Sequence, residues 1–129
     1  MKKNRDKISL KKILIIDDEA SFCRLVKMNL EISGKFSVFI CQEGKEGLRM
    51  ARQILPDVIL LDIMMPKTDG FQVLSALKGD AKTAEIPVIM ISASSDDTIR
   101  VRVGQTGCQY IPKPVNTKDL ISKIEALPK

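Results

Sequence analysis

The chain has 129 residues, of which 44% are hydrophobic, and this suits one domain with one core. Of its net charge of +5, all comes from residues 1–12, which hold six Lys or Arg and one Asp, because residues 13–129 hold fifteen charges of each sign. We expect a basic, flexible tail over residues 1–11 and a neutral domain over residues 12–128. This pattern favours neither nucleic-acid binding nor attachment to a membrane, and no apolar run approaches the ~20 residues of a membrane span.

Histidine is absent, which excludes nucleophiles activated by histidine and every metal motif that contains it. Cys23, Cys41 and Cys108 lie far apart without a Cys-x-x-Cys pair. They predict neither a disulfide framework nor a zinc site, and we interpret them as core thiols of a cytoplasmic protein. Any chemistry must therefore use carboxylates, hydroxyls and lysines.

Five short apolar runs alternate with helical patterns. The runs are nearly continuous in Ile, Val and Leu, as in parallel strands that helices cover on both faces. Strands are predicted at 13–16, 38–40, 58–61, 88–91 and 110–111; helices are predicted around 22–30, 47–55, 71–77, 98–103 and 117–127. The helix at 98–103 is the least regular, since Val101 and Val103 alternate as in a strand, and Gly104 and Gly107 follow closely. The order predicts an α/β fold with an open, doubly wound parallel sheet.

Polar side chains follow four of these strands at one sheet edge. Asp17 and Asp18 follow the first strand, and Asp62 follows the third, which we expect to be its neighbour. Carboxylates packed together repel one another unless a cation is present, and Mg²⁺ prefers oxygen ligands of this kind. Ser92 follows the fourth strand and Lys113 the fifth.

These groups suffice for phosphoryl transfer, which depends mostly on positioning and electrostatics. Asp62 is the candidate nucleophile, Lys113 the partner of a phosphate oxygen, and Ser92 a hydroxyl donor to another. Each residue alone has a simpler interpretation: a helix cap for Asp17, Asp18 or Ser92, a turn for Asp62, an exposed lysine for Lys113. The joint occurrence of complementary groups at four strand ends favours a functional site.

Four segments give the chain a strong resemblance to the receiver domain of two-component response regulators, from Lys12 to Leu127. They are Ile-Leu-Ile-Ile-Asp-Asp-Glu at 13–19, Asp-Val-Ile-Leu-Leu-Asp-Ile-Met-Met-Pro-Lys-Thr-Asp-Gly at 57–70, Ile-Pro-Val-Ile-Met-Ile-Ser-Ala at 86–93 and Tyr-Ile-Pro-Lys-Pro at 110–114. The resemblance implies a flavodoxin-like fold with strand order 2-1-3-4-5. It also implies that Asp62 takes a phosphoryl group from a phosphohistidine on a histidine kinase or a histidine phosphotransfer protein.

The resemblance further implies a role for each site residue. Asp18 and Asp62 ligate Mg²⁺ directly, Asp17 acts through a water, and the backbone carbonyl of Met64 is a further ligand. Lys113 contacts the phosphoryl group and precedes a cis peptide bond to Pro114.

Ser92 and Tyr110 form a switch that responds to phosphorylation and reshapes a face read by a downstream protein target. Such a domain catalyses its own phosphorylation and dephosphorylation without being a conventional enzyme, and it can form a homodimer when phosphorylated. Two features depart from the family pattern. The stretch from Ser92 to Lys113 is one residue shorter than usual, and Gly107-Cys108-Gln109 replaces Gly-Ala and two polar residues.

Three other functions compete with this interpretation. A phosphatase or mutase with an aspartyl-phosphate intermediate needs a second acid two residues after Asp62, where Met64 stands. A dinucleotide- or flavin-binding protein is disfavoured because no Gly-x-Gly-x-x-Gly follows the first strand. A receiver-like interaction module that is never phosphorylated stays open.

Overall fold

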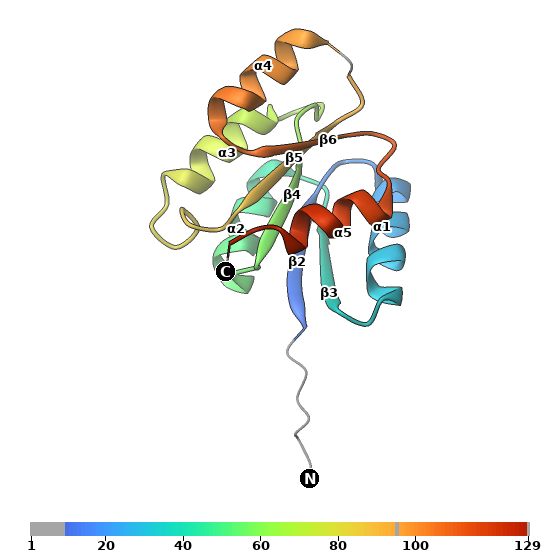
Figure 1. Ribbon diagram of the computed structural model, residues 1–129. Coiled ribbons are helices and arrows are strands. Elements are labelled where there is room, and N and C mark those ends of the chain that lie inside the picture. Colours follow the sequence, from blue (N-terminus) through green and yellow to red (C-terminus); the bar gives the residue numbers. More distant parts are fainter. Residues whose placement is uncertain (1–9, 95, 129) are drawn as a thin grey trace.

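The computed structural model describes residues 10–94 and 96–128, which form five strands that alternate with five helices (Figure 1). The strands are β2 (Lys11–Ile16), β3 (Phe36–Cys41), β4 (Val58–Asp62), β5 (Val88–Ser92) and β6 (Gln109–Pro112). The helices are α1 (Ala20–Ile32), α2 (Gly44–Ile54), α3 (Gly70–Lys78), α4 (Asp97–Thr106) and α5 (Thr117–Glu125). Most of the segment predicted as a tail, residues 1–9, lies outside the described residues, and Lys11 already belongs to β2.

All four strand pairings are parallel, and the order across the sheet is β3-β2-β4-β5-β6. Counted along the chain this is the order 2-1-3-4-5, so the predicted fold class is confirmed. The chain turns to one side of β2 to form β3 and then returns to form β4 on its other side. Ligands bind at such a reversal, beyond the carboxyl ends of the strands.

The sheet is buried on both faces because successive strand residues point to opposite sides. Ile13 and Ile15 of β2 pack with α1 and α5, whereas Leu14 and Ile16 pack with α2, α3 and α4. Figure 1 shows the same two layers of helices. The nearly continuous apolar runs of the sequence therefore reflect this double burial.

The ends of α4 and α5 differ from the prediction for physical reasons. The sequence predicts an end for α4 near Val103, but the helix continues through Gly104 to Thr106. The Asp96 carboxylate caps its first turn by accepting a hydrogen bond from the Thr98 N–H, and Gly107, with φ at 77°, ends it. At the other end of the chain, α5 stops at Glu125, although Leu127 still packs against the core. The apolar spacing reflects which residues pack against the core, and such residues can continue past the last helical turn.

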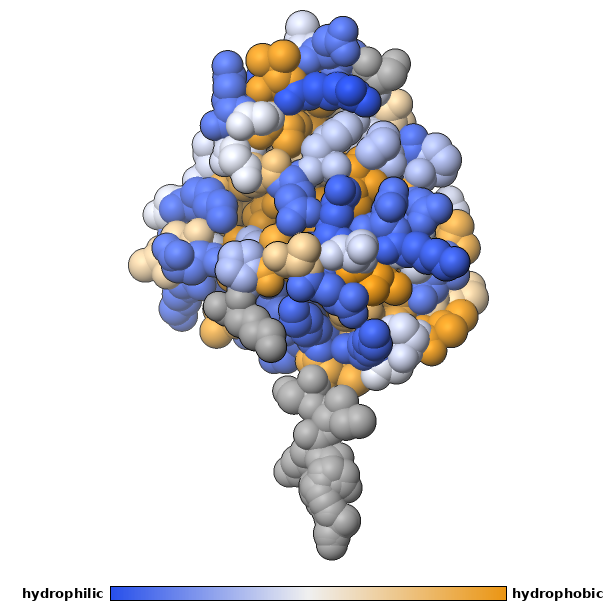
Figure 2. Space-filling view, in the orientation of Figure 1, coloured by the Kyte–Doolittle hydropathy of each residue, from blue (hydrophilic) through white to orange (hydrophobic). Residues whose placement is uncertain are grey.

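The surface is mostly hydrophilic on the face shown in Figure 2, with small hydrophobic areas between polar residues. Leu25, Met28 and Ile32 on α1 are more than half exposed. Cys23 and Cys41 are buried as predicted, whereas Cys108 is partly exposed. Over residues 10–94 and 96–128, every helix is too short or too polar to cross a membrane.

Gly70, the first residue of α3, packs against the strand end that carries Asp62. A methyl group at Gly70 would lie 2.4 Å from the Asp62 carbonyl oxygen and 2.6 Å from the Ile63 Cα. Both neighbours are backbone atoms, so neither can move aside without displacing the end of β4. The Asp69 side chain accepts a hydrogen bond from the Phe71 N–H and fixes the start of this helix. A glycine is therefore required for the close approach.

Gly70→Ala is expected to lower the free energy of unfolding by about 1–3 kcal/mol, the usual cost of forcing a group into a packed site. The matched control is Gly104→Ala, which also adds one methyl group to a helix but meets no atom within 4 Å. It should raise stability by about 0.5–1 kcal/mol, because alanine is the better helix former. Urea unfolding of the two variants measures both values. Equal changes in the free energy of unfolding for the two variants would show that the end of β4 can move aside to accommodate the methyl group.

Candidate functional site

Three carboxylates meet at the carboxyl ends of β2 and β4. Asp17 and Asp18 follow β2 directly, and Asp62 is the last residue of β4. One carboxylate oxygen from each of the three lies within 4.8 Å of the others. Asp17 is 0% exposed and Asp62 is 3% exposed, so water screens their charges poorly. The predicted convergence is confirmed.

Lys113 brings a positive charge to this cluster from the loop after β6. Its Nζ lies 2.9 Å from Asp17 Oδ2 and 3.7 Å from Asp62 Oδ2, and it donates a hydrogen bond to Glu19. The Lys113 backbone N–H also donates to the Ser92 carbonyl at 2.9 Å, which ties this loop to β5. The predicted cis bond between Lys113 and Pro114 is present.

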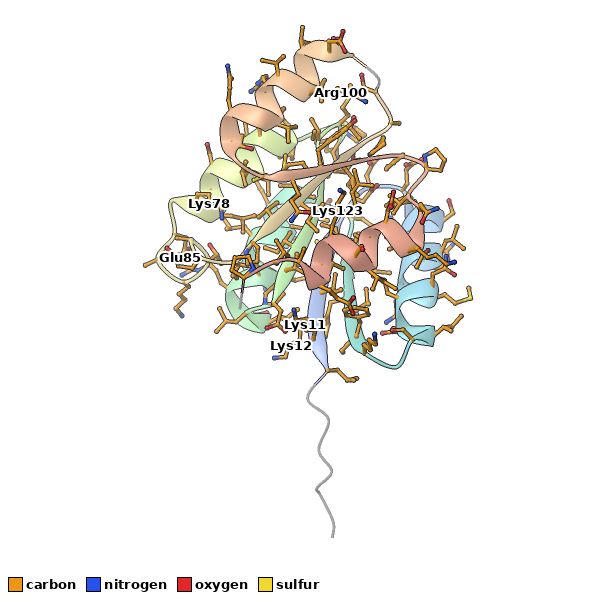
Figure 3. All side chains as sticks on the ribbon, viewed as in Figure 1. Lys11, Lys12, Lys78, Glu85, Arg100 and Lys123 are labelled. Atoms are coloured by element: carbon orange, nitrogen blue, oxygen red, sulfur yellow. The ribbon has the colours of Figure 1, made fainter. Side chains whose placement is uncertain are left out.

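Several other basic side chains lie far from this cluster (Figure 3). Figure 3 labels Lys11 and Lys12 at the opposite, amino-terminal end of β2, and Arg100 on α4. At that far end the Lys12 backbone N–H donates to the Asp57 carboxylate. The two edges of the sheet therefore differ in character, and the acidic cluster lies at the edge where the fold predicts ligand binding.

Burial and mutual repulsion govern the protonation of the cluster. Burial, followed by the charge of Asp17, raises the pKa of Asp62 to about 6. Burial also raises the pKa of Asp17 above its usual range. Burial opposes the charge on Lys113, but the hydrogen bond to Glu19 and the nearby carboxylates of Asp17 and Asp62 outweigh it, and the pKa of the ammonium rises. The single lysine does not offset the repulsion between the buried carboxylates.

One buried carboxylate oxygen of the cluster lacks a hydrogen bond. Asp17 Oδ2 forms an ion pair with Lys113 Nζ at 2.9 Å, but it accepts no hydrogen bond among the described residues. A buried carboxylate oxygen without a hydrogen bond is costly even beside an ammonium. A divalent cation bound to oxygen ligands would relieve this cost, and the three converging aspartates are the donor set that Mg²⁺ prefers. The residues present fit the predicted metal.

The simpler interpretations are only partly supported. Glu19 occupies the N-cap of α1, but its side chain accepts no capping hydrogen bond. Ser92 does not cap α4, because Asp96 does so. The Met64 N–H donates to Asp62 Oδ1 at 3.3 Å, so Asp62 does support a turn. This weak bond leaves Asp62 Oδ2 in the cluster.

The remaining predicted residues lie around the cluster. Met64 follows β4 with its side chain 59% exposed, and the role of its carbonyl as a ligand stays a prediction. Ser92 is buried at the end of β5, where its Oγ accepts a hydrogen bond from the Ser94 N–H. The Tyr110 hydroxyl donates to the Ser94 carbonyl at 3.2 Å. Both switch residues thus contact the same loop, and their switching stays a prediction.

Two residues without a predicted role also contact the site. Glu19 binds Lys113, and the Phe22 ring centroid lies 4.4 Å from Lys113 Nζ, within the range of a cation–π contact. Both residues belong to the start of α1. The acidic run Asp17-Asp18-Glu19 was a signal for the first, since all three residues lie at the same sheet edge. The contact of Phe22, one turn later, depends on the direction of its side chain, which the sequence motifs do not predict.

The chain is similar to response regulator receiver domains. The family model described as response regulator receiver domain matches residues 13–125. The chain is 38% identical over 117 residues to the DNA-binding dual master transcriptional regulator RpaA of Synechocystis, covering 90% of this chain and 48% of the relative. It is 36% identical over 119 residues to the transcriptional regulatory protein CpxR of Escherichia coli, covering 92% of this chain and 49% of the relative. The chain spans about half the length of these curated relatives.

Solved structures give the same result. A response regulator receiver domain protein described as CheY-like, from Methanospirillum hungatei, superposes with a TM-score of 0.81 at 31% identity, covering 91% of this chain and 92% of that one. The chemotaxis protein CheY4 of Vibrio cholerae superposes with a TM-score of 0.83 at 24% identity, covering 93% of this chain and 100% of that one. The second likeness concerns the fold alone.

The raised pKa of Asp62 predicts how stability depends on pH in the absence of metal. The folded protein holds the Asp62 proton up to about pH 6, whereas the unfolded chain loses it near the ordinary aspartate pKa of 3.8. Stability from this group is therefore present at low pH and declines as the pH rises between these values. At pH 8, Asp62→Asn should be more stable than the wild type by roughly 1–3 kcal/mol, and this difference should vanish below pH 4.

Urea unfolding at pH 3.5 and pH 8 with a chelator measures the difference. The matched control, Asp97→Asn, removes a charge from an exposed residue of α4 and should change stability by at most about 0.5 kcal/mol at either pH. Added Mg²⁺ should stabilise the wild type more than Asp62→Asn. Parallel behaviour of the wild type and Asp62→Asn across this pH range would show that repulsion at Asp62 is not the dominant force.

Proposed function

The chain belongs to the family of response regulator receiver domains, the phosphoacceptor modules of two-component signalling, and we propose that Asp62 is its phosphoacceptor. The observation that carries this proposal is the buried cluster of Asp17, Asp18 and Asp62 with Lys113 beside it. The donor is a phosphohistidine on a histidine kinase or a histidine phosphotransfer protein. Because these 129 residues contain no histidine, the donor residue lies outside them.

In the proposed reaction an Asp62 carboxylate oxygen attacks the phosphorus of the phosphohistidine. The new bond joins this oxygen to phosphorus, the bond from phosphorus to the imidazole nitrogen breaks, and its electron pair stays on the imidazole. Asp62 must be ionised to attack, and above about pH 6 it carries the required charge. Lys113 is close enough to both Asp17 and Asp62 to meet an oxygen of the transferred group.

Asp18 and Asp62 are the proposed direct ligands of Mg²⁺, with Asp17 acting through a water and Met64 contributing its carbonyl oxygen. When bound, the ion neutralises carboxylate and phosphoryl charge. The convergence of the three carboxylates and the buried Asp17 Oδ2, which accepts no hydrogen bond among the described residues, support this assignment. Burial holds these side chains in place before the donor arrives, which is the arrangement that transfer by positioning requires.

Ser92 and Tyr110 are the proposed switch. The support is their shared contact with Ser94, which joins the end of β5 to β6 near the phosphorylation site. Movement of the Ser92 hydroxyl toward a phosphoryl oxygen would disturb the loop that holds the Tyr110 hydroxyl. The surface of α4 and β6 would then change for a downstream protein target, or for a second copy of the phosphorylated chain.

Two further points concern the setting of the domain. We propose a cytoplasmic location, which the three free thiols favour because they suit a reducing compartment. The printed name of one relative states DNA binding, but this chain matches about half of that relative, and we propose that it binds no nucleic acid directly. A module that is never phosphorylated is less well supported. Buried like charges lower stability, and proteins keep such a cost mainly at sites where a function requires it.

The proposal is tested by incubating the protein with acetyl phosphate and Mg²⁺ and following the intact mass. The wild type should gain one phosphoryl group that hydroxylamine removes, as expected for an acyl phosphate. Asp62→Asn should gain none, and Lys113→Ala should gain it at least tenfold more slowly, because about 1.4 kcal/mol of lost stabilisation is a factor of ten.

The matched control is Asp57→Asn, which changes an aspartate at the opposite edge of the sheet. It should gain the phosphoryl group at the wild-type rate. Labelling of Asp62→Asn to the wild-type level, or a wild type that gains no labile group, would refute the assignment of Asp62.

A further inference from the structure

Lys113 is held by the start of α1 as well as by the aspartates. Its ammonium donates a hydrogen bond to Glu19 and lies 4.4 Å from the Phe22 ring centroid, whereas Asp62 Oδ2 is 3.7 Å away and accepts no hydrogen bond from it. The Lys113 side chain is only 10% exposed, so these neighbours determine where the ammonium lies. Glu19 therefore competes with Asp62 for the lysine.

Glu19 is well suited to a contact that must be released. Its side chain is 57% exposed, so water screens its ion pair, and pairs of this kind contribute little stability. Its carboxylate caps no helix end, although Glu19 is the N-cap of α1. The Asp17 contact to Lys113 differs, because Asp17 is fully buried. Of the carboxylates around the ammonium, Glu19 is the one that can turn outward into solvent.

The position of Glu19 itself is fixed. The Glu19 backbone N–H donates to Asp17 Oδ1 at 2.9 Å, and the Cys23 N–H donates to the Glu19 carbonyl at 3.0 Å. The first turn of α1 is thereby attached to the acidic cluster. The Phe22 ring lies on the same turn and keeps the ammonium at the site if the carboxylate leaves. Only the side chain of Glu19 has to move.

Resting on the proposed function, we propose that Glu19 is a positioning residue for Lys113. In the unphosphorylated protein it draws the ammonium away from Asp62, and it releases the ammonium when a phosphoryl group with greater negative charge occupies Asp62. Charge-assisted bonds to such a group are stronger than a screened pair with one carboxylate. Breaking the pair between Glu19 and Lys113 thus reduces the free energy that the phosphoryl group gains by binding Lys113.

The test uses beryllofluoride, a mimic of the phosphoryl group, with Mg²⁺ and the full chain. Glu19→Gln should bind it roughly twofold to fivefold more tightly than the wild type, the factor that corresponds to a partly exposed ion pair. The matched control is Glu43→Gln. Glu43 is the N-cap of α2 at the same edge of the sheet, is exposed, and likewise makes no side-chain capping bond. Its variant should bind as the wild type does.

Three further measurements separate positioning from a general effect of charge or stability. Glu19→Asp, which keeps the charge, should return affinity toward the wild-type value. In a Lys113→Ala background, Glu19→Gln should have no effect, because the coupling acts through the lysine. In ¹⁵N spectra of the free protein, the Lys113 ammonium signal should be sharp in the wild type, because the hydrogen bond to Glu19 slows exchange of its protons with water. The signal should be broad in Glu19→Gln, where this exchange is faster.

Equal or weaker beryllofluoride binding by Glu19→Gln, beside a wild type that binds it, would overturn this inference and leave the proposed function intact. An unchanged effect of Glu19→Gln in the Lys113→Ala background would also overturn it, by showing that the charge acts directly. A wild type that neither binds beryllofluoride nor accepts a phosphoryl group would overturn the proposed function, and this inference with it.

Discussion

Repulsion between buried carboxylates at the carboxyl ends of β2 and β4 is the constraint on which the site depends. Asp17 and Asp62 are both buried, and Asp18 shares the same small space. The Lys113 ammonium pairs with three carboxylates, those of Asp17, Glu19 and Asp62, and Asp18 adds a fourth to the cluster. The site therefore keeps an excess of negative charge that the described residues do not neutralise. A divalent cation fits this excess, and the cluster is too acidic to serve only as a structural ion pair.

The scaffold tolerates this repulsion because the rest of the domain is strongly apolar. Every residue of β4 is buried, and its apolar side chains pack into the clusters on both faces of the sheet. Burial of this kind contributes about 25 cal/mol per Å² of apolar surface. Gly70 then allows α3 to approach the end of β4 closely, which holds Asp62 at the edge. The polar site is placed where the apolar sheet ends.

Much of the fold and of the site could be predicted from sequence, for identifiable reasons. Continuous apolar runs indicated strands buried on both sides, and parallel pairing carries all strand ends to one edge, so Asp17, Asp18 and Asp62 had to converge. The end of α4 was not predictable, because glycine inside a helix looks like a helix end, and the capping by Asp96 depends on geometry. The contacts of Lys113 with Glu19 and Phe22 depend on side-chain direction, which spacing alone does not fix.

The exposed fraction of each partner gives Lys113 two kinds of contact with different purposes. Buried Asp17 fixes the ammonium within the cluster, whereas Glu19, more than half exposed, holds it by a bond that water weakens. A lysine bound only to buried carboxylates would be held too strongly to follow a new charge on Asp62. A lysine bound only to exposed ones would be poorly positioned when the phosphoryl group arrives. The combination keeps the ammonium near Asp62 while leaving it free to change partners, and a reversible signal requires both properties.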